Sequence, residues 1–328
     1  MVEPGGRGAR SESGKSVFDR LAQRKLVIVS GKGGVGRTTM ATIIGLALAA
    51  RGRKTLVATT GHDDRLAWML GHDQLRDTPA AVDEHLHIQR LIPQTCLREY
   101  GTLVIRSARV ASAVFDNGVV SKLLHAIPGL DDFAVVGKAW HEAARGDDYD
   151  VVVFDGPATG HLLYTLGLPH AILDTVASGP LTKEARLMQD TLADPALTEA
   201  VLVGLPERWP LTELAELGAS LQQRIGIALQ TIIVNGIWPA PIEGFGDGGG
   251  DEARAAALSY LAELSAVGAG HRREVTSWLA SEIAQGLGIR GVLGVPWRWD
   301  GLCDRPTLHT LWQMLDRPET DAPVADVG

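Results

Sequence analysis

A glycine-rich segment near the start of the chain has the residue types and spacing of a phosphate-binding loop. Its sequence is Ser30-Gly31-Lys32-Gly33-Gly34-Val35-Gly36-Arg37-Thr38-Thr39. Glycines let a backbone turn its N–H groups toward a ligand, and the N-terminus of a following helix adds partial positive charge, so such a segment attracts a polyphosphate. The hydroxyl of Thr38 is expected to bind Mg²⁺. We therefore predict that residues 31–39 bind the phosphates of ATP.

Arg37 occupies the position at which the usual phosphate loop has a lysine. Arginine keeps the positive charge, but its guanidinium is larger and planar and binds through a fork, so the exchange is not neutral. We expect ATP to bind and hydrolysis to be weakened or lost. A glycine-rich turn that binds nothing is the alternative; the flanking strand and helix patterns disfavour it.

A second candidate segment follows the apolar run Val151–Phe154 and reads Asp155-Gly156-Pro157-Ala158-Thr159-Gly160-His161. An aspartate at the end of such a strand, beside a phosphate loop, is expected to hold Mg²⁺ directly or through water. Gly160 permits close approach of the backbone, so a γ-phosphate would draw the segment inward and its loss would release it. The alternative is that Asp155 only caps the following helix.

Strand-like and helical patterns alternate around these motifs. Apolar strand patterns occur at 25–30, 55–59, 149–154, 200–203, 231–234 and 292–295, and a helical pattern follows the loop to residue 50. The alternation predicts an α/β fold with a doubly wound, mostly parallel sheet, in which ligands bind at the carboxyl ends of the strands.

The domain organisation follows from composition. We expect a flexible tail over residues 1–22, one domain over 23–316 and a second flexible tail over 317–328. A charged, helical stretch at about 88–145 predicts a helical insertion, which is either a partner surface or a covering layer. The glycine-rich stretch 239–250 is expected to be mobile.

The bulk properties exclude several classes of protein. The 328 residues have a net charge of -8 without a basic cluster, which argues against nucleic-acid binding. No apolar run has membrane-spanning length, and the first 15 residues lack the apolar core of a signal peptide. Cys96 and Cys303 are the two cysteines and form no CxxC motif. These features favour a cytoplasmic protein without a transmembrane segment.

The chain resembles the ArsA family from about Lys25 to Leu315, with the motifs in family order. The resemblance rests on Gly31–Gly36, Asp155–Pro169, Val201–Glu207 and Ile233-Val234-Asn235. The family contains the arsenite-pump ATPase, the eukaryotic ATPase that targets tail-anchored membrane proteins, and bacterial relatives. The resemblance implies a P-loop NTPase fold and a homodimer, or a heterodimer with an ArsA-like paralogue, that closes over nucleotide.

Residue roles follow from the same resemblance. Lys32 is similar to the signature lysine of deviant Walker A loops, which reaches the phosphates held by the partner subunit. Asp155 would complete the metal shell with Thr38, and Asn235 would contact the adenine. The alternatives are that Lys32 is an ordinary loop cation and that Asn235 belongs to an Asn-Gly turn.

The sequence also departs from the family. Thr60 stands where the family has an aspartate that orients the attacking water, and threonine is no base near neutral pH. Asp63 or Asp64 would replace it if their loop folds inward, because geometry decides such a role; otherwise they form a solvated acidic turn. Two separate cysteines cannot supply a three-thiol arsenite site or a CxxC zinc site.

Two functions remain open from the sequence. The first is a slow Mg²⁺-dependent ATPase whose nucleotide-driven dimer closure controls an unidentified protein partner. The second is a nucleotide-binding subunit that does not hydrolyse ATP and pairs with an active paralogue. A Min- or Par-type positioning ATPase is disfavoured, because the chain lacks an amphipathic membrane helix and a basic DNA surface.

Overall fold

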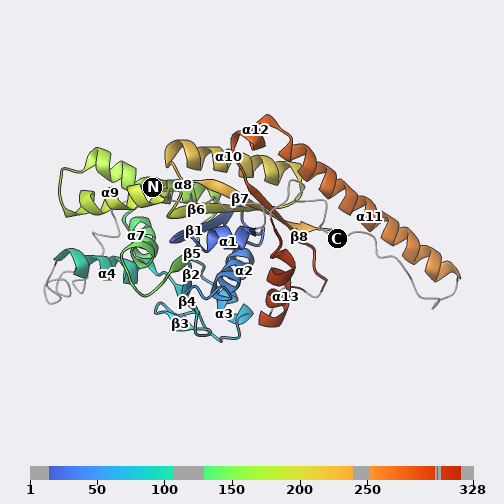
Figure 1. Cartoon of the computed structure of the whole chain (residues 1–328), viewed down its shortest axis with the longest axis horizontal. Helices are drawn as coiled ribbons and strands as arrows, with labels where there is room; N and C mark the ends of the chain where they lie inside the picture. The colour runs from blue at the N-terminus through green and yellow to red at the C-terminus, as the bar shows by residue number, and fades with distance from the viewer. Residues whose placement is uncertain (1–14, 106–128, 239–250, 300, 302–303, 319–328) are drawn as a thin grey trace, which may run out of the picture.

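The computed structural model describes residues 15–105, 129–238, 251–299, 301 and 304–318. Its centre is an eight-stranded sheet with the order β3-β4-β2-β5-β1-β6-β7-β8 (Figure 1). The strands are β1 Leu26–Gly31, β2 Thr55–Thr59, β3 Ala80–Ala81, β4 Leu86–Arg90, β5 Val151–Asp155, β6 Thr198–Gly204, β7 Leu229–Ile237 and β8 Gly291–Pro296. All neighbouring strands pair in parallel except the short edge pair β3–β4. The predicted α/β class is confirmed.

Helices cover both faces of the sheet. They are α1 Val17–Leu21, α2 Arg37–Ala49, α3 Arg65–Met69, α4 Pro93–Ile105, α7 Leu130–Ala144, α8 Thr159–Thr175, α9 Pro180–Ala193, α10 Arg208–Arg224, α11 Asp251–Leu279, α12 Glu282–Gly286 and α13 Arg305–Leu315. Side chains of β1 alternate between the two cores, as a strand's period of two requires. Leu26 and Ile28 pack with the α7–α10 side, and Val27 and Val29 pack with α2 and α13.

Strand β1 lies at the centre of the sheet, where it positions the glycine-rich loop. It pairs with β5 on one side and β6 on the other, so the loop begins between the carboxyl ends of two neighbours. All six residues of β1 are buried. Helix α2 follows the loop, and nearly all of its residues are buried. The loop therefore stands on rigid elements.

The structure corrects the expected N-terminal tail. Residues 1–14 lie outside the described part, but Ser16 caps helix α1 and Val17, Phe18 and Leu21 are fully buried. The apolar spacing within this short segment makes a helical turn with a buried face. The domain thus includes residues that we expected to be flexible. The C-terminal tail begins with a bridge between Ser16 and Pro318, and its residues 319–328 lie outside the described part.

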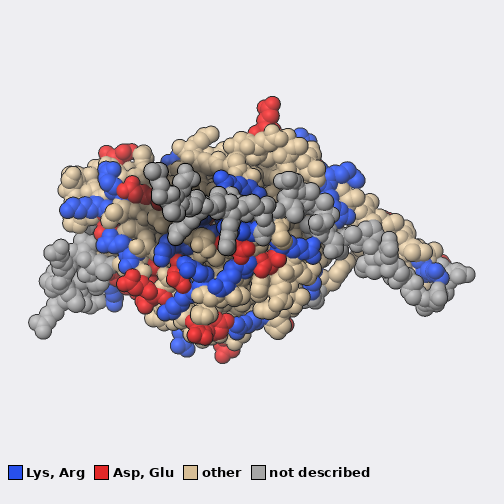
Figure 2. Space-filling view, viewed as in Figure 1, with Lys and Arg blue, Asp and Glu red and all other residues tan. Residues whose placement is uncertain are grey.

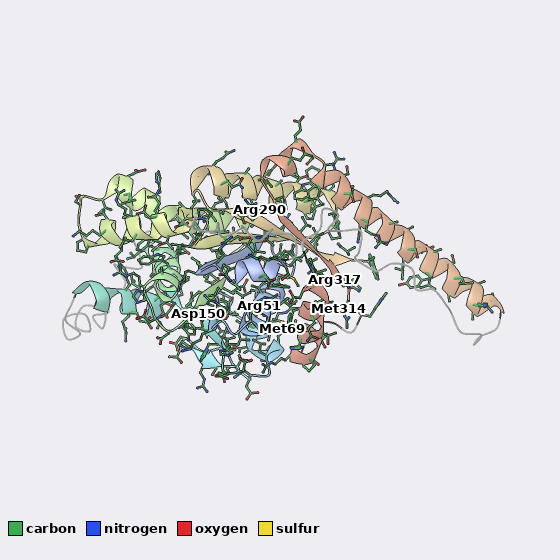
Figure 3. All side chains as sticks on the ribbon, in the orientation of Figure 1. Arg51, Met69, Asp150, Arg290, Met314 and Arg317 are labelled. Carbon is green, nitrogen blue, oxygen red and sulfur yellow. The ribbon has the colours of Figure 1, made fainter. Side chains whose placement is uncertain are left out.

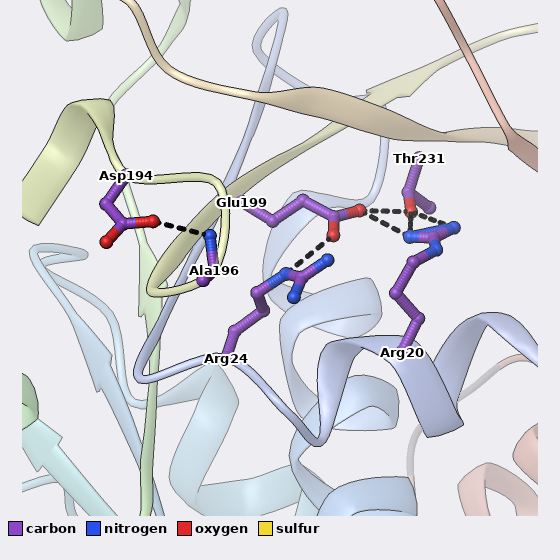
Figure 4. Close-up of polar contacts among 6 residues, drawn as sticks. All are labelled: Arg20, Arg24, Asp194, Ala196, Glu199 and Thr231. Carbon is purple, nitrogen blue, oxygen red and sulfur yellow. Dashed lines mark hydrogen bonds and ion pairs between the residues drawn. The ribbon is translucent and has the colours of Figure 1, made fainter. Parts of the chain in front are cut away.

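A buried ion-pair network attaches α1 to the sheet (Figure 4). Glu199 on β6 has no exposed surface, and its carboxylate accepts from Arg20 Nη1 at 2.7 Å, Arg24 Nε at 3.2 Å and Thr231 Oγ1 at 2.7 Å. A buried carboxylate is stable only when such partners compensate for its lost hydration. Removing either arginine should therefore destabilise the contact of α1 with β6.

Arg51, labelled in Figure 3, forms ion pairs with both described ends of the chain. Its guanidinium pairs with Asp19 of α1 at 2.8 Å and with Asp316, the C-cap of α13, at 2.5 Å. Both helices also pack on the buried face of α2. The terminal elements are thus held on the same side of the sheet as the loop's helix.

The expected helical insertion begins later than predicted. Residues 88–90 belong to β4, which pairs in parallel with β2 from Thr55–Leu86 to Thr59–Arg90. Within the predicted range the described helices are α4 and α7, which cover one face of the sheet. Residues 106–128 lie outside the described part, as does the stretch 239–250 that we expected to be mobile.

The surface is mixed in charge. Figure 2 shows Lys and Arg interspersed with Asp and Glu over the visible face. Such interspersion is unlike the single-sign surface that duplex binding needs. Within the part of the chain that the structure describes, no helix combines the length and apolar character needed to cross a membrane.

Candidate functional site

The glycine-rich loop has the backbone geometry of a ligand cradle. Gly34 and Gly36 have φ angles of 85° and 93°, a region that L side chains rarely adopt. A Cβ on Gly31 would lie 2.1 Å from the carbonyl oxygen of Val203, so the start of the loop is pressed against β6. By contrast, a Cβ on Gly33 would meet no atom within 4 Å. The loop is tight at its ends and open at its middle.

Asn235 holds the loop from the other side. Its Nδ2 donates to the carbonyl oxygen of Val35 at 2.9 Å, and a Cβ on Gly36 would approach the same Nδ2 to 2.5 Å. The residue lies within β7, where Gly236 has a positive φ angle. Asn235 therefore shapes the loop, a contact that the sequence did not indicate.

Asp155 lies at the carboxyl end of β5, next to the first turn of α2. Thr38 Oγ1 donates to its Oδ2 at 2.7 Å, and Thr59 Oγ1 donates to the same oxygen at 2.8 Å. The residue is 4% exposed, and its Oδ1 has no hydrogen-bond partner among the described residues. A buried acceptor without a partner is costly unless a ligand satisfies it. Together with the hydroxyl of Thr38, this oxygen fits the hard, oxygen-only donor set of Mg²⁺.

Burial raises the pKa of Asp155, while hydrogen bonds from Thr38 and Thr59 and the charge of Arg37 act in the opposite direction. The raised pKa means that the ionised carboxylate lowers the stability of the folded protein. A cation bound at Oδ1 would offset that destabilisation, which is a further reason why the donor set fits a metal ion.

Arg37 connects the two candidate segments. Its Nη1 donates to the carbonyl oxygen of Gly156, directly after Asp155. Ser30 Oγ donates to the carbonyl oxygen of Pro157 at 2.8 Å, and the Gly156 N–H donates to the carbonyl oxygen of Val29 at 2.9 Å. The segment after β5 is therefore fastened to the strand and loop that precede α2.

The remaining residues of the predicted loop and switch differ in exposure. Val35 and Thr39 are buried behind the loop, at 3% and 6% exposed. Gly160 lies in the exposed first turn of α8, and a Cβ there would meet no atom within 4 Å. The space beside Gly160 is consistent with close approach of a ligand or of a moving segment.

Lys32 forms an ion pair within its own chain. Its Nζ lies 2.7 Å from Glu213 Oε1 on α10, and the two side chains are 58% and 41% exposed. The contact follows from the sheet order, because β6 lies beside β1 and leads into α10.

The two acidic candidates after β2 have different surroundings. Asp64 Oδ1 pairs with Arg90 at 2.8 Å and accepts from the Leu75 N–H at 2.9 Å, so its carboxylate supports the loop. Asp63 is exposed and accepts from the Arg65 N–H at 3.3 Å. Its charge also acts on Asp155 and raises that residue's pKa. Of the two carboxylates, that of Asp63 is the more exposed.

Two features of the site were missed from the sequence. Thr59 bridges β2 to the site, since its hydroxyl donates to Asp155 and accepts from the Gly61 N–H at 3.0 Å. Three tryptophans also gather at the ends of β7 and β8: Trp238 stacks on Trp297 with centroids 5.5 Å apart and meets Trp299 at 5.0 Å. The Trp-Arg-Trp sequence directly after β8 was the available signal, because two large aromatic residues so close together in a polar segment predict an exposed apolar cluster.

Comparison with known proteins bears on these motifs. Residues 24–179 match the family described as anion-transporting ATPases. A Halobacterium salinarum protein named for an arsenical pump-driving ATPase is 29% identical over 75% of this chain and 40% of its own length. ATPase BagA of Mycobacterium tuberculosis is 28% identical over 71% of this chain and 72% of its own length. ATPase GET3 of Kluyveromyces lactis is 29% identical over 51% of this chain and 52% of its own length. The chain thus spans well under two thirds of two of these relatives.

Proposed function

We propose that this chain, which matches the anion-transporting ATPase family over residues 24–179, is an ArsA-type ATPase that binds ATP with Mg²⁺ at residues 31–39 and hydrolyses it slowly. Main-chain N–H groups of the loop would bind the phosphates, assisted by the N-terminus of α2. Nucleotide binding would then drive closure of two subunits and so control a protein partner.

The observation that supports this proposal most directly is the unpartnered Oδ1 of Asp155 beside Thr38, among the residues that the structure describes. These two residues would hold Mg²⁺, which when bound supplies positive charge against the charge that develops on the phosphates. The Thr38 hydroxyl now donates to Asp155 and would have to turn its oxygen to the metal. Thr59 would keep Asp155 oriented during that change.

The slow rate would follow from two departures in the site. Arg37 donates to the Gly156 carbonyl, so it must exchange that bond for one to a phosphate. The water-orienting role would fall to Asp63, whose exposed carboxylate accepts from the Arg65 N–H of its own turn at 3.3 Å. A poorly fixed group positions water less well, and catalysis depends on that positioning.

Turnover by purified protein tests the proposal, with ATP and Mg²⁺ and with the variants Thr38→Ala and Asp155→Ala. Both variants should lose Mg²⁺-dependent phosphate release. Thr42→Ser is a matched control, because Thr42 lies one turn further along α2 and its hydroxyl bonds to the helix backbone. Unchanged turnover in both site variants would remove the proposal.

A second candidate function is a nucleotide-binding subunit that does not hydrolyse ATP and pairs with an active paralogue. The hydrogen bond from Arg37 to the Gly156 carbonyl and the ion pair of Asp64 with Arg90 favour it, because both side chains are already bound within the chain. Calorimetry would then show ATP binding without turnover by the isolated chain, and activity would appear on adding the paralogue. Substantial hydrolysis by the isolated chain would contradict it.

A further inference from the structure

The contact between Lys32 and Glu213 joins the phosphate loop to helix α10. Lys32 Nζ and Glu213 Oε1 are 2.7 Å apart, and both side chains are partly exposed. The other oxygen, Glu213 Oε2, is buried without a hydrogen-bond partner among the described residues. Lys32 is therefore the partner that this structure provides for the Glu213 carboxylate.

The contact is suited to exchange. Lysine has a compact ammonium on a flexible four-carbon stem, so Nζ can swing while the loop backbone stays in place. Half-exposed ion pairs are weak and are screened by salt, since water competes for both charges. A polyphosphate with several negative charges attracts the ammonium more strongly than a single carboxylate does.

We propose that Glu213 is a positioning residue that holds Lys32 within its own subunit until nucleotide bound by a second copy of this chain takes the lysine over. The inference rests on the proposed nucleotide-driven pairing of subunits. The contact makes the free energy of pairing less favourable, because each Lys32 that moves to the other subunit leaves the half-buried Glu213 carboxylate without a partner. Without nucleotide, no phosphate is present to offset that loss.

Removing the charge of Glu213 should make closure easier. The variant Glu213→Gln keeps the shape of the side chain but binds an ammonium less tightly. We expect the dimer Kd with an ATP analogue to fall roughly two- to fivefold per subunit, the range given by exposed ion pairs. Glu216→Gln is the matched control, because Glu216 is exposed three residues further along α10 and the substitution removes the same charge.

The experiment combines sedimentation of the full chain with acylation of lysines read by mass spectrometry. Without nucleotide, Lys32 should react several-fold faster in Glu213→Gln than in the wild type and the control. With a non-hydrolysable ATP analogue, Lys32 should become protected again in all three, as the dimer forms. In a Lys32→Ala background, Glu213→Gln should no longer change the dimer Kd.

The outcomes separate this inference from the proposed activity. Equal Lys32 reactivity and equal dimer Kd in wild type and Glu213→Gln would overturn the inference while leaving ATP turnover untouched. A Kd effect that persists in Lys32→Ala would also overturn it, because the effect would then not pass through the lysine. Absence of a nucleotide-dependent dimer in the wild type would overturn the inference, whereas absence of turnover alone would overturn only the activity.

Discussion

Thr38 and Asp155 lie 117 positions apart in the chain, yet the hydroxyl of one donates to the carboxylate of the other across 2.7 Å. The contact joins the first turn of α2 to the end of β5, which lie together because β1 and β5 are neighbours in the sheet. It brings a hydroxyl and a carboxylate oxygen without a partner among the described residues to the same point, at the end of the phosphate loop.

Replacing Asp155 with asparagine should stabilise the nucleotide-free protein while abolishing Mg²⁺-dependent turnover. Burial raises the pKa of Asp155 above its ordinary value of 3.8, so the carboxylate destabilises the folded state where it is ionised. The wild type should therefore lose stability as pH rises from about 4 through the raised pKa, and Asp155→Asn should not. The amide oxygen of the variant can still accept from the hydroxyls of Thr38 and Thr59, so the substitution removes the charge and keeps both contacts.

Urea unfolding at a series of pH values measures this difference. We expect Asp155→Asn to be the more stable protein at pH 8, because the substitution removes a buried negative charge. The two proteins should converge near pH 4. A constant difference at every pH would contradict the explanation by ionisation.

Changing Arg37 should separate ATP binding from hydrolysis. Arg37→Lys should raise kcat, because an ammonium is compact and would not be held by the hydrogen bond that Arg37 Nη1 donates to the Gly156 carbonyl. Arg37→Ala should weaken ATP binding about tenfold or more, the effect of losing a charge-assisted hydrogen bond. Calorimetry and phosphate release measure the two quantities. A lower kcat in Arg37→Lys would show that arginine is adapted to the reaction.

Two glycines of the loop should respond differently to alanine. Gly36→Ala should destabilise the protein by about 1–2 kcal/mol from its positive φ angle alone, and it should also displace the Asn235 side chain. Gly33→Ala is the control, because its Cβ meets open space. Thermal unfolding without nucleotide compares them. Equal Tm values would mean that the loop adjusts freely around Gly36.

The two aspartates after β2 should separate catalysis from stability. Asp63→Asn should lower kcat about a hundredfold if this carboxylate orients or deprotonates the water, with little change in Tm. Asp64→Asn should instead lower the stability by about 1 kcal/mol, because it weakens the contacts with Arg90 and the Leu75 N–H. Turnover and Tm of both variants provide the test. A kcat unaffected by Asp63→Asn would exclude that role.

The sequence by itself determined the central strands, the glycine-rich loop and the expectation of an ArsA-type α/β fold. These features depend on residues close together in the chain: a β-branched apolar run, glycines that allow positive φ angles and a helical apolar pattern directly after them. Asp155 was found for the same reason, since it ends an apolar strand. Short-range steric preferences and the periodicity of apolar residues can be read from the sequence alone.

Only the tertiary structure decided which side chains meet. The pairing of Lys32 with Glu213, the bond from Asn235 to Val35 and the support of Asp155 by Thr59 join residues on different strands or helices. The order β2-β5-β1-β6-β7 brings their elements together, and strand order is a property of the whole packed sheet. The N-terminal helix was missed likewise, because its burial depends on packing against α2 and on the ion pair of its Arg20 with the distant Glu199.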